Sequence, residues 1–351
     1  MRSSYKSEDV ELLLKDITGL VEPQPTQERE RLIQSGRHYC EMLPVEYVPT
    51  EEYMRTYREA LENFSSVVAR AVGRLCDKMI ETKGRDMVLV SLARAGIPIG
   101  ILLKRYLAKK YNLTVPHYAI SIIRGRGIDE NAMKYLLDRH QAEQLLFVDG
   151  WIGKGAILRE LKKNIEKYEG VSSDIAVLAD PAFVTPLCGT HEDILIPSSC
   201  LNCTVSGLIS RTFLRDDIIG ANDFHGAIYY SNLEDSDLSY EFIASIEKEF
   251  EMENEEEEEA TGSTGSGMEE VKRLAEKYHV TDINLIKPGI GETTRVLLRR
   301  VPWKVLIDER YKNDLQLKHV IRLAAEKEVA VEYCSLSNYK CCGIIKKLAD
   351  T

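Results

Sequence analysis

The chain has 351 residues, of which 44% are hydrophobic and 29% charged, and its net charge is −10. This length allows two domains with separate cores, and the composition is that of a globular protein. No stretch reaches the roughly 18 to 20 uncharged apolar residues that a membrane span needs, and residues 1–16 lack the apolar segment of a secretory signal. We expect a cytoplasmic protein with no membrane partner, and eight cysteines in so long a chain do not indicate a disulfide framework.

Charge divides the chain unevenly. Residues 268–351 carry 16 Lys and Arg against 12 Asp and Glu, a net of +4, whereas residues 1–267 carry 30 against 44, a net of −14. Between these parts, a strongly acidic run is followed by a Gly/Ser-rich segment, and such segments are extended tethers. The predicted organisation is a domain over 1–246, a linker over 247–267 and a second domain over 268–351.

Apolar periodicity in the first domain predicts helices that alternate with short strands. In chain order these are a helix at 51–81, a strand at 87–91, a helix at 97–111, a strand at 117–123, a helix at 131–141, a strand at 145–148, a helix at 154–168 and a strand at 175–178. This alternation indicates an α/β fold with a mostly parallel, doubly wound sheet. Such sheets bind ligands in the loops at the carboxyl ends of their strands.

Three of these loops have the residues of an anion site. Arg94, Ala95 and Gly96 follow the first strand, where an arginine beside a helix N-terminus can hold an anion. Asp149 ends a later strand, and the turn after it can cradle a phosphate with successive backbone amides; its residues are Gly153, Lys154, Gly155 and Ala156. A third, flexible basic loop contains Arg124 and Arg126.

In combination and in this order, the loops resemble those of the type I phosphoribosyltransferases. Three further segments are similar to the tellurite-resistance-associated branch of that fold, labelled StiP and described as cysteine-protease-like: Ser35 to Pro44, Ser121 to Asp129 and Ile196 to Gly207. The sequence departs from the transferase pattern at Gly150, where a second acid is usual, and at Gly153-Lys154, where two threonines are usual.

The resemblance implies a phosphoribosyltransferase that uses phosphoribosyl diphosphate and a nucleobase-like acceptor in a stress pathway. Arg124, Arg126 and Asp149 would be catalytic, and the diphosphoribose would be held by Arg94 to Gly96, Asp149 and Gly153 to Ala156. Mg²⁺ would be bound mainly through the substrate, with no protein metal site. The acceptor pocket would be lined by Ser198, Ser199, Cys200 and Asn202. A homodimer is compatible with this interpretation.

Two alternatives remain open. Because Gly150 replaces an acid, the first domain could sense a nucleotide or diphosphoribose without catalysis. A cysteine hydrolase is the other alternative, with Cys200 as nucleophile and His191 as base. A zinc site formed by Cys188, His191, Cys200 and Cys203 is disfavoured, because residues 193–197 read as a strand that would hold the two pairs apart.

The second domain is predicted to be a small α-β-α sandwich. Its elements are a helix at 269–278, a strand at 283–286, a helix at 293–299, a strand at 304–307, a helix at 315–327, a strand at 330–333, then a loop and a helix. The glycine turn before the second helix resembles the RNA-contacting element of Pelota and kink-turn-binding proteins, although Gly291 stands where asparagine is usual. The resemblance implies binding of structured RNA through Gly289, Gly291, Glu292, Arg295 and Lys340.

Overall fold

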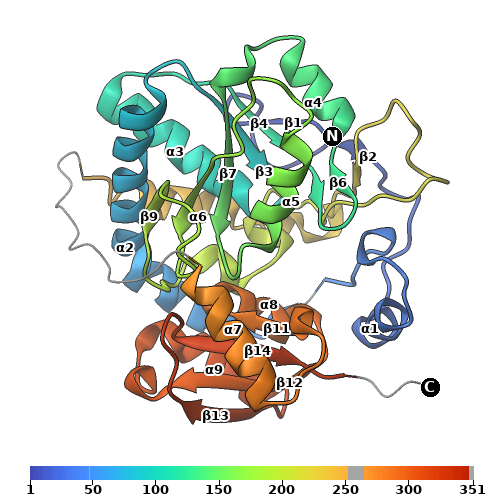
Figure 1. Ribbon diagram of the computed structural model, residues 1–351, viewed down its shortest axis with the longest axis vertical. Helices are drawn as coiled ribbons and strands as arrows, with labels where there is room; N and C mark the ends of the chain where they lie inside the picture. Colours follow the sequence, from blue (N-terminus) through green and yellow to red (C-terminus); the bar gives the residue numbers. More distant parts are fainter. Residues whose placement is uncertain (47, 252–264, 348–351) are drawn as a thin grey trace.

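The computed structural model describes residues 1–46, 48–251 and 265–347, which form a larger and a smaller α/β unit packed against each other (Figure 1). Thirteen residues of the predicted linker, 252–264, lie outside the described residues. The preceding part of that linker is structured: Phe250 packs edge-on against Tyr106, with ring centroids 5.0 Å apart. No helix in the described part of the chain is both long and apolar enough to span a bilayer.

The larger unit is built on a six-stranded sheet in which every neighbouring pair of strands is parallel. The spatial order of its strands is β1 (Glu11–Leu12), β4 (His117–Ile120), β3 (Val88–Leu92), β7 (Leu145–Trp151), β8 (Ile175–Ala179) and β9 (Cys188–Thr190). The central strands β3 and β8 are buried along their whole length, as expected for a sheet covered on both faces. The predicted α/β fold class is confirmed.

Helices cover both faces of this sheet (Figure 1). One face packs against α2 (Glu51–Lys83), α3 (Gly96–Tyr111) and α6 (Ser239–Glu247), and the other against α4 (Glu130–Leu137) and α5 (Ala156–Ile165). Helix α2 begins after Thr50, whose side chain accepts a hydrogen bond from the Tyr53 amide, and ends at Gly84 with φ +76°. The remaining elements are α1 (Thr26–Gln34) and two pairs of short strands, β2 (Lys15–Asp16) with β10 (Gly226–Ala227) and β5 (Ile122–Ile123) with β6 (Gly127–Ile128).

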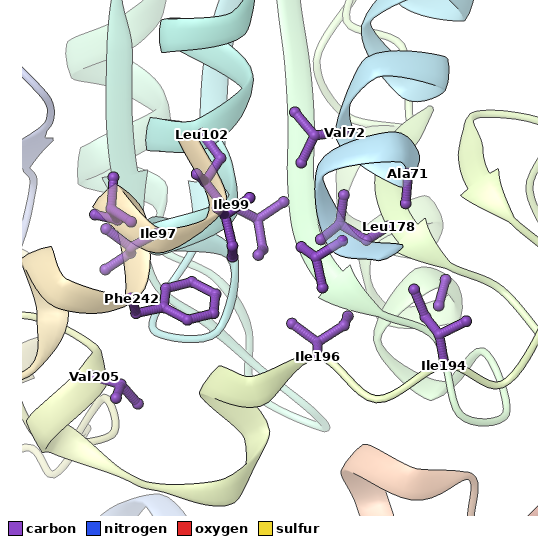
Figure 2. Packing of buried hydrophobic residues seen from close by; sticks show 14 of the residues in the cluster. Ala71, Val72, Ile97, Ile99, Leu102, Leu178, Ile194, Ile196, Val205 and Phe242 are labelled. Atoms are coloured by element: carbon purple, nitrogen blue, oxygen red, sulfur yellow. The ribbon is translucent and has the colours of Figure 1, made fainter. Parts of the chain in front are cut away.

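The largest apolar cluster lies between the sheet and the layer of α2, α3 and α6. Figure 2 shows Val72 of α2, Ile99 of α3, Leu178 of β8 and Phe242 of α6 converging on this space, and all four are fully buried. Truncating a buried Phe to Ala typically costs about 3–5 kcal/mol. This core holds the carboxyl ends of β3 and β7 in fixed positions.

The smaller unit is a four-stranded mixed sheet with α7 (Ser266–Lys277) on one face and α8 (Ile290–Arg299) and α9 (Lys318–Glu326) on the other. Its strand order is β11 (Ile286–Pro288), β14 (Cys341–Ile345), β12 (Pro302–Asp308) and β13 (Ala330–Cys334). The predicted α-β-α sandwich is confirmed.

Two predicted elements of the smaller unit are wrong. Residues Ile283–Leu285, expected in a strand, form a 3-10 turn, and the strand begins only at Ile286. The expected last helix is instead β14, which is completely buried and pairs antiparallel with both β11 and β12. The run of two cysteines, Gly343 and two isoleucines fits a buried central strand, whose continuous apolar pattern does not distinguish it from a helix.

Candidate functional site

The carboxyl ends of β3 and β7 meet at a cavity of about 260 Å³. Asp149 of β7 and Arg94, which follows β3, both line it. The Arg94 guanidinium donates to the Ile209 carbonyl at 2.7 Å and lies 3.3 Å from a Glu46 carboxylate oxygen. Burial raises the pKa of Asp149 to about 6. The structure therefore brings these two predicted residues into one site.

The loop after β3 must approach β7 closely. Ala95 lines the cavity, and Gly96 begins α3. A Cβ at Gly96 would lie 2.4 Å from the Val148 carbonyl oxygen, so only glycine fits there.

The phosphate-cradle turn after β7 contacts the smaller unit. Gly153, Lys154, Gly155 and Ala156 line a second cavity of about 540 Å³. The Lys154 ammonium donates to the carbonyl oxygen of Ile286 at 2.8 Å and also to that of Ile283. Burial, followed by repulsion from Lys287, lowers the pKa of Lys154 to about 7. In this arrangement the predicted phosphate lysine holds backbone of the C-terminal unit.

The two remaining predicted catalytic residues differ in placement: Arg124 shares the larger cavity with Asp149 and residues 153–156, whereas Arg126 does not line it. Arg124 lines the larger cavity and donates to Asn284 at 2.9 Å, whereas Arg126 points to Glu41, 2.9 Å away. Of the residues predicted to line an acceptor pocket, three line the smaller cavity: Ser198, Ser199 and Asn202. Cys200 is not among its lining residues, because it is fully buried below it.

The predicted RNA-contacting residues lie against the larger unit. A Cβ at Gly291 would lie 2.2 Å from the Trp151 ring, and the Arg295 guanidinium stacks 4.3 Å from the centroid of that ring. Arg295 also pairs with Glu292 at 2.6 Å. Of the other two predicted residues, Gly289 lies beside Asp193 of the larger unit. The Lys340 ammonium pairs with Asp314 of the smaller unit at 3.0 Å. In this arrangement, the glycine turn faces the larger unit.

The cysteines pair with histidines differently from the sequence prediction. The Cys188 thiol lies 3.4 Å from Nε2 of His191. Nδ1 of His191 lies 2.8 Å from the Asp180 carbonyl and 3.8 Å from an Asp180 carboxylate oxygen, and the Phe183 ring stacks on the imidazole with centroids 4.2 Å apart. Because Nδ1 faces a carbonyl, it must donate, which leaves Nε2 as the acceptor toward the thiol.

The alternative in which Cys200 pairs with His191 has no contact between the two side chains among the described residues. His191 follows the short edge strand β9, while the segment 193–197, predicted as a strand, forms none, and Cys200 ends a 3-10 helix buried beneath α2. Burial raises the pKa of the Cys200 thiol to about 12. Among the described residues, no group of three or more His, Cys, Asp or Glu side chains could hold a metal ion, so Cys188, His191, Cys200 and Cys203 form no zinc site there.

A second thiol–imidazole contact was not predicted. His38 Nδ1 lies 2.9 Å from the Cys40 thiol, and His38 Nε2 lies 3.1 Å from the Arg124 carbonyl. Burial raises the pKa of Cys40 to about 11. The spacing of His38 and Cys40 in the sequence was the available signal. Sequence reasoning also missed the cavity residues Trp151 and Arg211, which carry no local motif.

The geometry defines a two-domain α/β protein with two basic interdomain cavities and two separate thiol–imidazole contacts. A family model described as "Tellurite-like stress resistance cysteine protease StiP" matches residues 3–247, and the chain belongs to this family. The model of the Pelota RNA-binding domain matches residues 265–347. A protein of Acinetobacter baylyi named "Cysteine protease StiP" is 34% identical, over 98% of this chain and 94% of its own length.

Solved phosphoribosyltransferases are similar to this chain only at a low level. The xanthine-guanine-hypoxanthine enzyme of Helicobacter pylori is 19% identical over 38% of this chain and 76% of its own, with a TM-score of 0.24. The hypoxanthine enzyme of Trypanosoma cruzi is 19% identical over 39% and 81%, with a TM-score of 0.28. The predicted phosphoribosyltransferase function is contradicted by the full-length relative and by the family, both of which are named for cysteine proteolysis.

Proposed function

We propose that this chain is a thiol-dependent hydrolase in which Cys188 is the nucleophile and His191 its general base. The main support for this proposal is the 3.4 Å contact between the Cys188 thiol and Nε2 of His191. The other imidazole nitrogen is directed at Asp180. A nucleophile beside a base that a third group orients is the recurrent arrangement of such enzymes. The name of the Acinetobacter baylyi relative supports a peptide as the substrate.

The proposed reaction needs only these side chains and water. Nε2 of His191 takes the thiol proton, and the thiolate attacks the peptide carbonyl carbon. The imidazolium returns its proton to the leaving amine as the C–N bond breaks. Water, deprotonated by the same nitrogen, then hydrolyses the thioester and regenerates the thiol.

The proposed nucleophile does not lie in an open cleft. Cys188 is fully buried, and His191 retains 25% of its side-chain exposure beside Phe183. A substrate can reach the sulfur only if the turn that carries Phe183 moves. We therefore place the entrance at this turn, between β8 and β9.

Peptidase assays on single variants test the proposal. Cys188→Ala should reduce hydrolysis of a fluorogenic peptide library at least a hundredfold, while Cys200→Ala, a matched change at a buried thiol, should stay within twofold. Cys40→Ala tests the second thiol–imidazole pair, whose imidazole has no carboxylate within ion-pair distance among the described residues. Full activity in Cys188→Ala, with folding intact, would reject this nucleophile.

A second proposed activity is the binding of structured RNA by the C-terminal domain. The match of residues 265–347 to the Pelota RNA-binding domain and the net charge of +4 over residues 268–351 support it. Because Gly291 and Arg295 pack against Trp151, this binding requires the domains to separate. Filter binding should therefore give tighter capture of a kinked RNA by Asp193→Arg, which disrupts the docking, than by the wild type. Equal, salt-independent binding by both would contradict it.

A further inference from the structure

The two interdomain cavities are strongly basic. They adjoin, since Tyr39, Asp149, Trp151 and Arg295 line both. Apart from Asp149, the charged residues that line the smaller cavity are all arginines: Arg94, Arg211, Arg295 and Arg299. The larger cavity adds six cations against two further acids, Asp282 and Glu292; the cations are Arg29, Arg124, Lys154, Lys287, Arg300 and Lys347. The cationic side chains around the cavities therefore lie close enough to repel one another.

The Arg211 guanidinium has no carboxylate partner among the described residues. It stacks over the Tyr39 ring at 4.4 Å, and no described residue forms a hydrogen bond or ion pair with it. Burial, followed by repulsion from Arg29, lowers its pKa to about 10. Arg211 is half-buried, and a guanidinium in such a position is normally paired because removing an uncompensated charge from water is costly.

Arg299 faces the same space from the smaller unit. Its Nε donates to the Asn202 side-chain oxygen at 2.5 Å, a neutral partner. Burial, followed by repulsion from Arg94, lowers its pKa well below the usual range. Arg94 and Arg295, by contrast, have carboxylate partners in Glu46 and Glu292. Both domains thus present cations that lack carboxylates.

We propose that this cavity binds a small ligand with at least two phosphate groups, held by Arg94 and Arg211 of the larger domain and by Arg295 and Arg299 of the smaller one. Planar guanidinium groups match phosphate oxygens in pairs of hydrogen bonds. The volumes, about 260 and 540 Å³, are those of small-molecule sites and favour such a ligand over an RNA strand. A ligand that bridges both sets of arginines also stabilises the docked domains.

This site is independent of the proposed hydrolase, because neither Cys188 nor His191 lines either cavity. Calorimetry and thermal melting of the full chain with inorganic pyrophosphate at fixed ionic strength test it. We expect micromolar binding and a raised Tm, with sulfate at least tenfold weaker. Cys188→Ala should bind pyrophosphate like the wild type.

Charge-removing variants separate a ligand site from a structural role. Arg211→Met and Arg299→Met should each weaken pyrophosphate binding at least tenfold, while the ligand-free Tm of Arg211→Met stays equal or rises because repulsion is relieved. Arg273→Met, at an exposed arginine of α7, is the control and should bind normally. No heat and no Tm shift at millimolar pyrophosphate, or equal losses in Arg273→Met, would overturn the proposal. Displacement of pyrophosphate by single-stranded RNA at lower concentrations would assign the cavity to RNA instead.

Discussion

Asp193 of the larger domain accepts a hydrogen bond from the backbone amide of Ile290, the first residue of α8, at 3.0 Å. Its other carboxylate oxygen accepts from the Lys340 amide at 2.9 Å. One side chain therefore satisfies a free amide at a helix N-terminus and another in the loop before β14. Asp193 is a direct link between the two domains.

Replacing Asp193 with Ala should loosen this docking. Two buried amides lose their acceptor, which costs about 1–3 kcal/mol. We expect faster hydrogen exchange at Ile290 and Lys340 and a lower Tm. Asp138→Ala, at an exposed carboxylate paired only with Lys134 among the described residues, is the control and should leave both amides protected. Unchanged protection in Asp193→Ala would show that apolar packing alone holds the domains.

Lys154 should make stability depend on pH above neutrality. Its folded pKa of about 7 lies below the ordinary value of 10.5, so the folded state disfavours the charged form. The resulting penalty is complete below pH 7 and fades as pH rises toward 10.5. Relative to Lys154→Met, the wild type should gain about 2 kcal/mol of unfolding free energy between pH 7 and 9. Urea titrations at both pH values measure this, and a constant difference would contradict the assignment.

Asp149 should make stability depend on pH below neutrality. Burial raises its folded pKa to about 6, above the ordinary 3.8, so the folded state disfavours the carboxylate. The resulting loss of folding stability is absent below pH 3.8, grows between pH 3.8 and about 6, and is complete above pH 6. Asp149→Asn should therefore be more stable than the wild type by about 1–3 kcal/mol at pH 7.5 and equal to it near pH 3.5. Chemical denaturation at the two pH values decides it.

Phe183 should control the reactivity of Cys188. Its ring stacks on His191, and its backbone has φ +54°, a strained conformation for a residue with a side chain. Phe183→Gly removes the ring and relieves this strain. We expect iodoacetamide to alkylate Cys188 at least several times faster in this variant, as followed by mass spectrometry of the Cys188 peptide. The Cys200 peptide is an internal control, and a parallel increase there would indicate general unfolding.

The sheet of the larger domain was predictable because its signals are local. Strands such as Val88–Leu92 are short apolar runs ended by turns, and Arg94 and Asp149 meet because the ends of parallel strands share an edge. The docking was not predictable. Lys154 and Ile286 are 132 residues apart, and a lysine after a glycine turn reads as a phosphate ligand until the other domain is in place.

The proposed catalytic pair was only partly predictable from the sequence. Cys188 and His191 have a visible spacing in the sequence, but whether they face each other depends on where the edge strand stops. Cys200 lies in a polar segment that reads as exposed, and it is buried by α2, whose Tyr53 hydroxyl donates to its carbonyl at 2.8 Å. Burial from a distant helix has no local sequence signature.

The contact between Gly291 and the Trp151 ring limits how the two halves of the chain can diverge. Any side chain at position 291 would collide with that indole, and a Cβ at Gly153 would lie 2.9 Å from the Glu292 side chain. A C-terminal domain transplanted from a relative with a larger residue at 291 would dock only if the receiving chain also had a smaller residue at 151. The acidic run in the sequence between the domains makes them look interchangeable, whereas this interface requires them to be inherited as a matched pair.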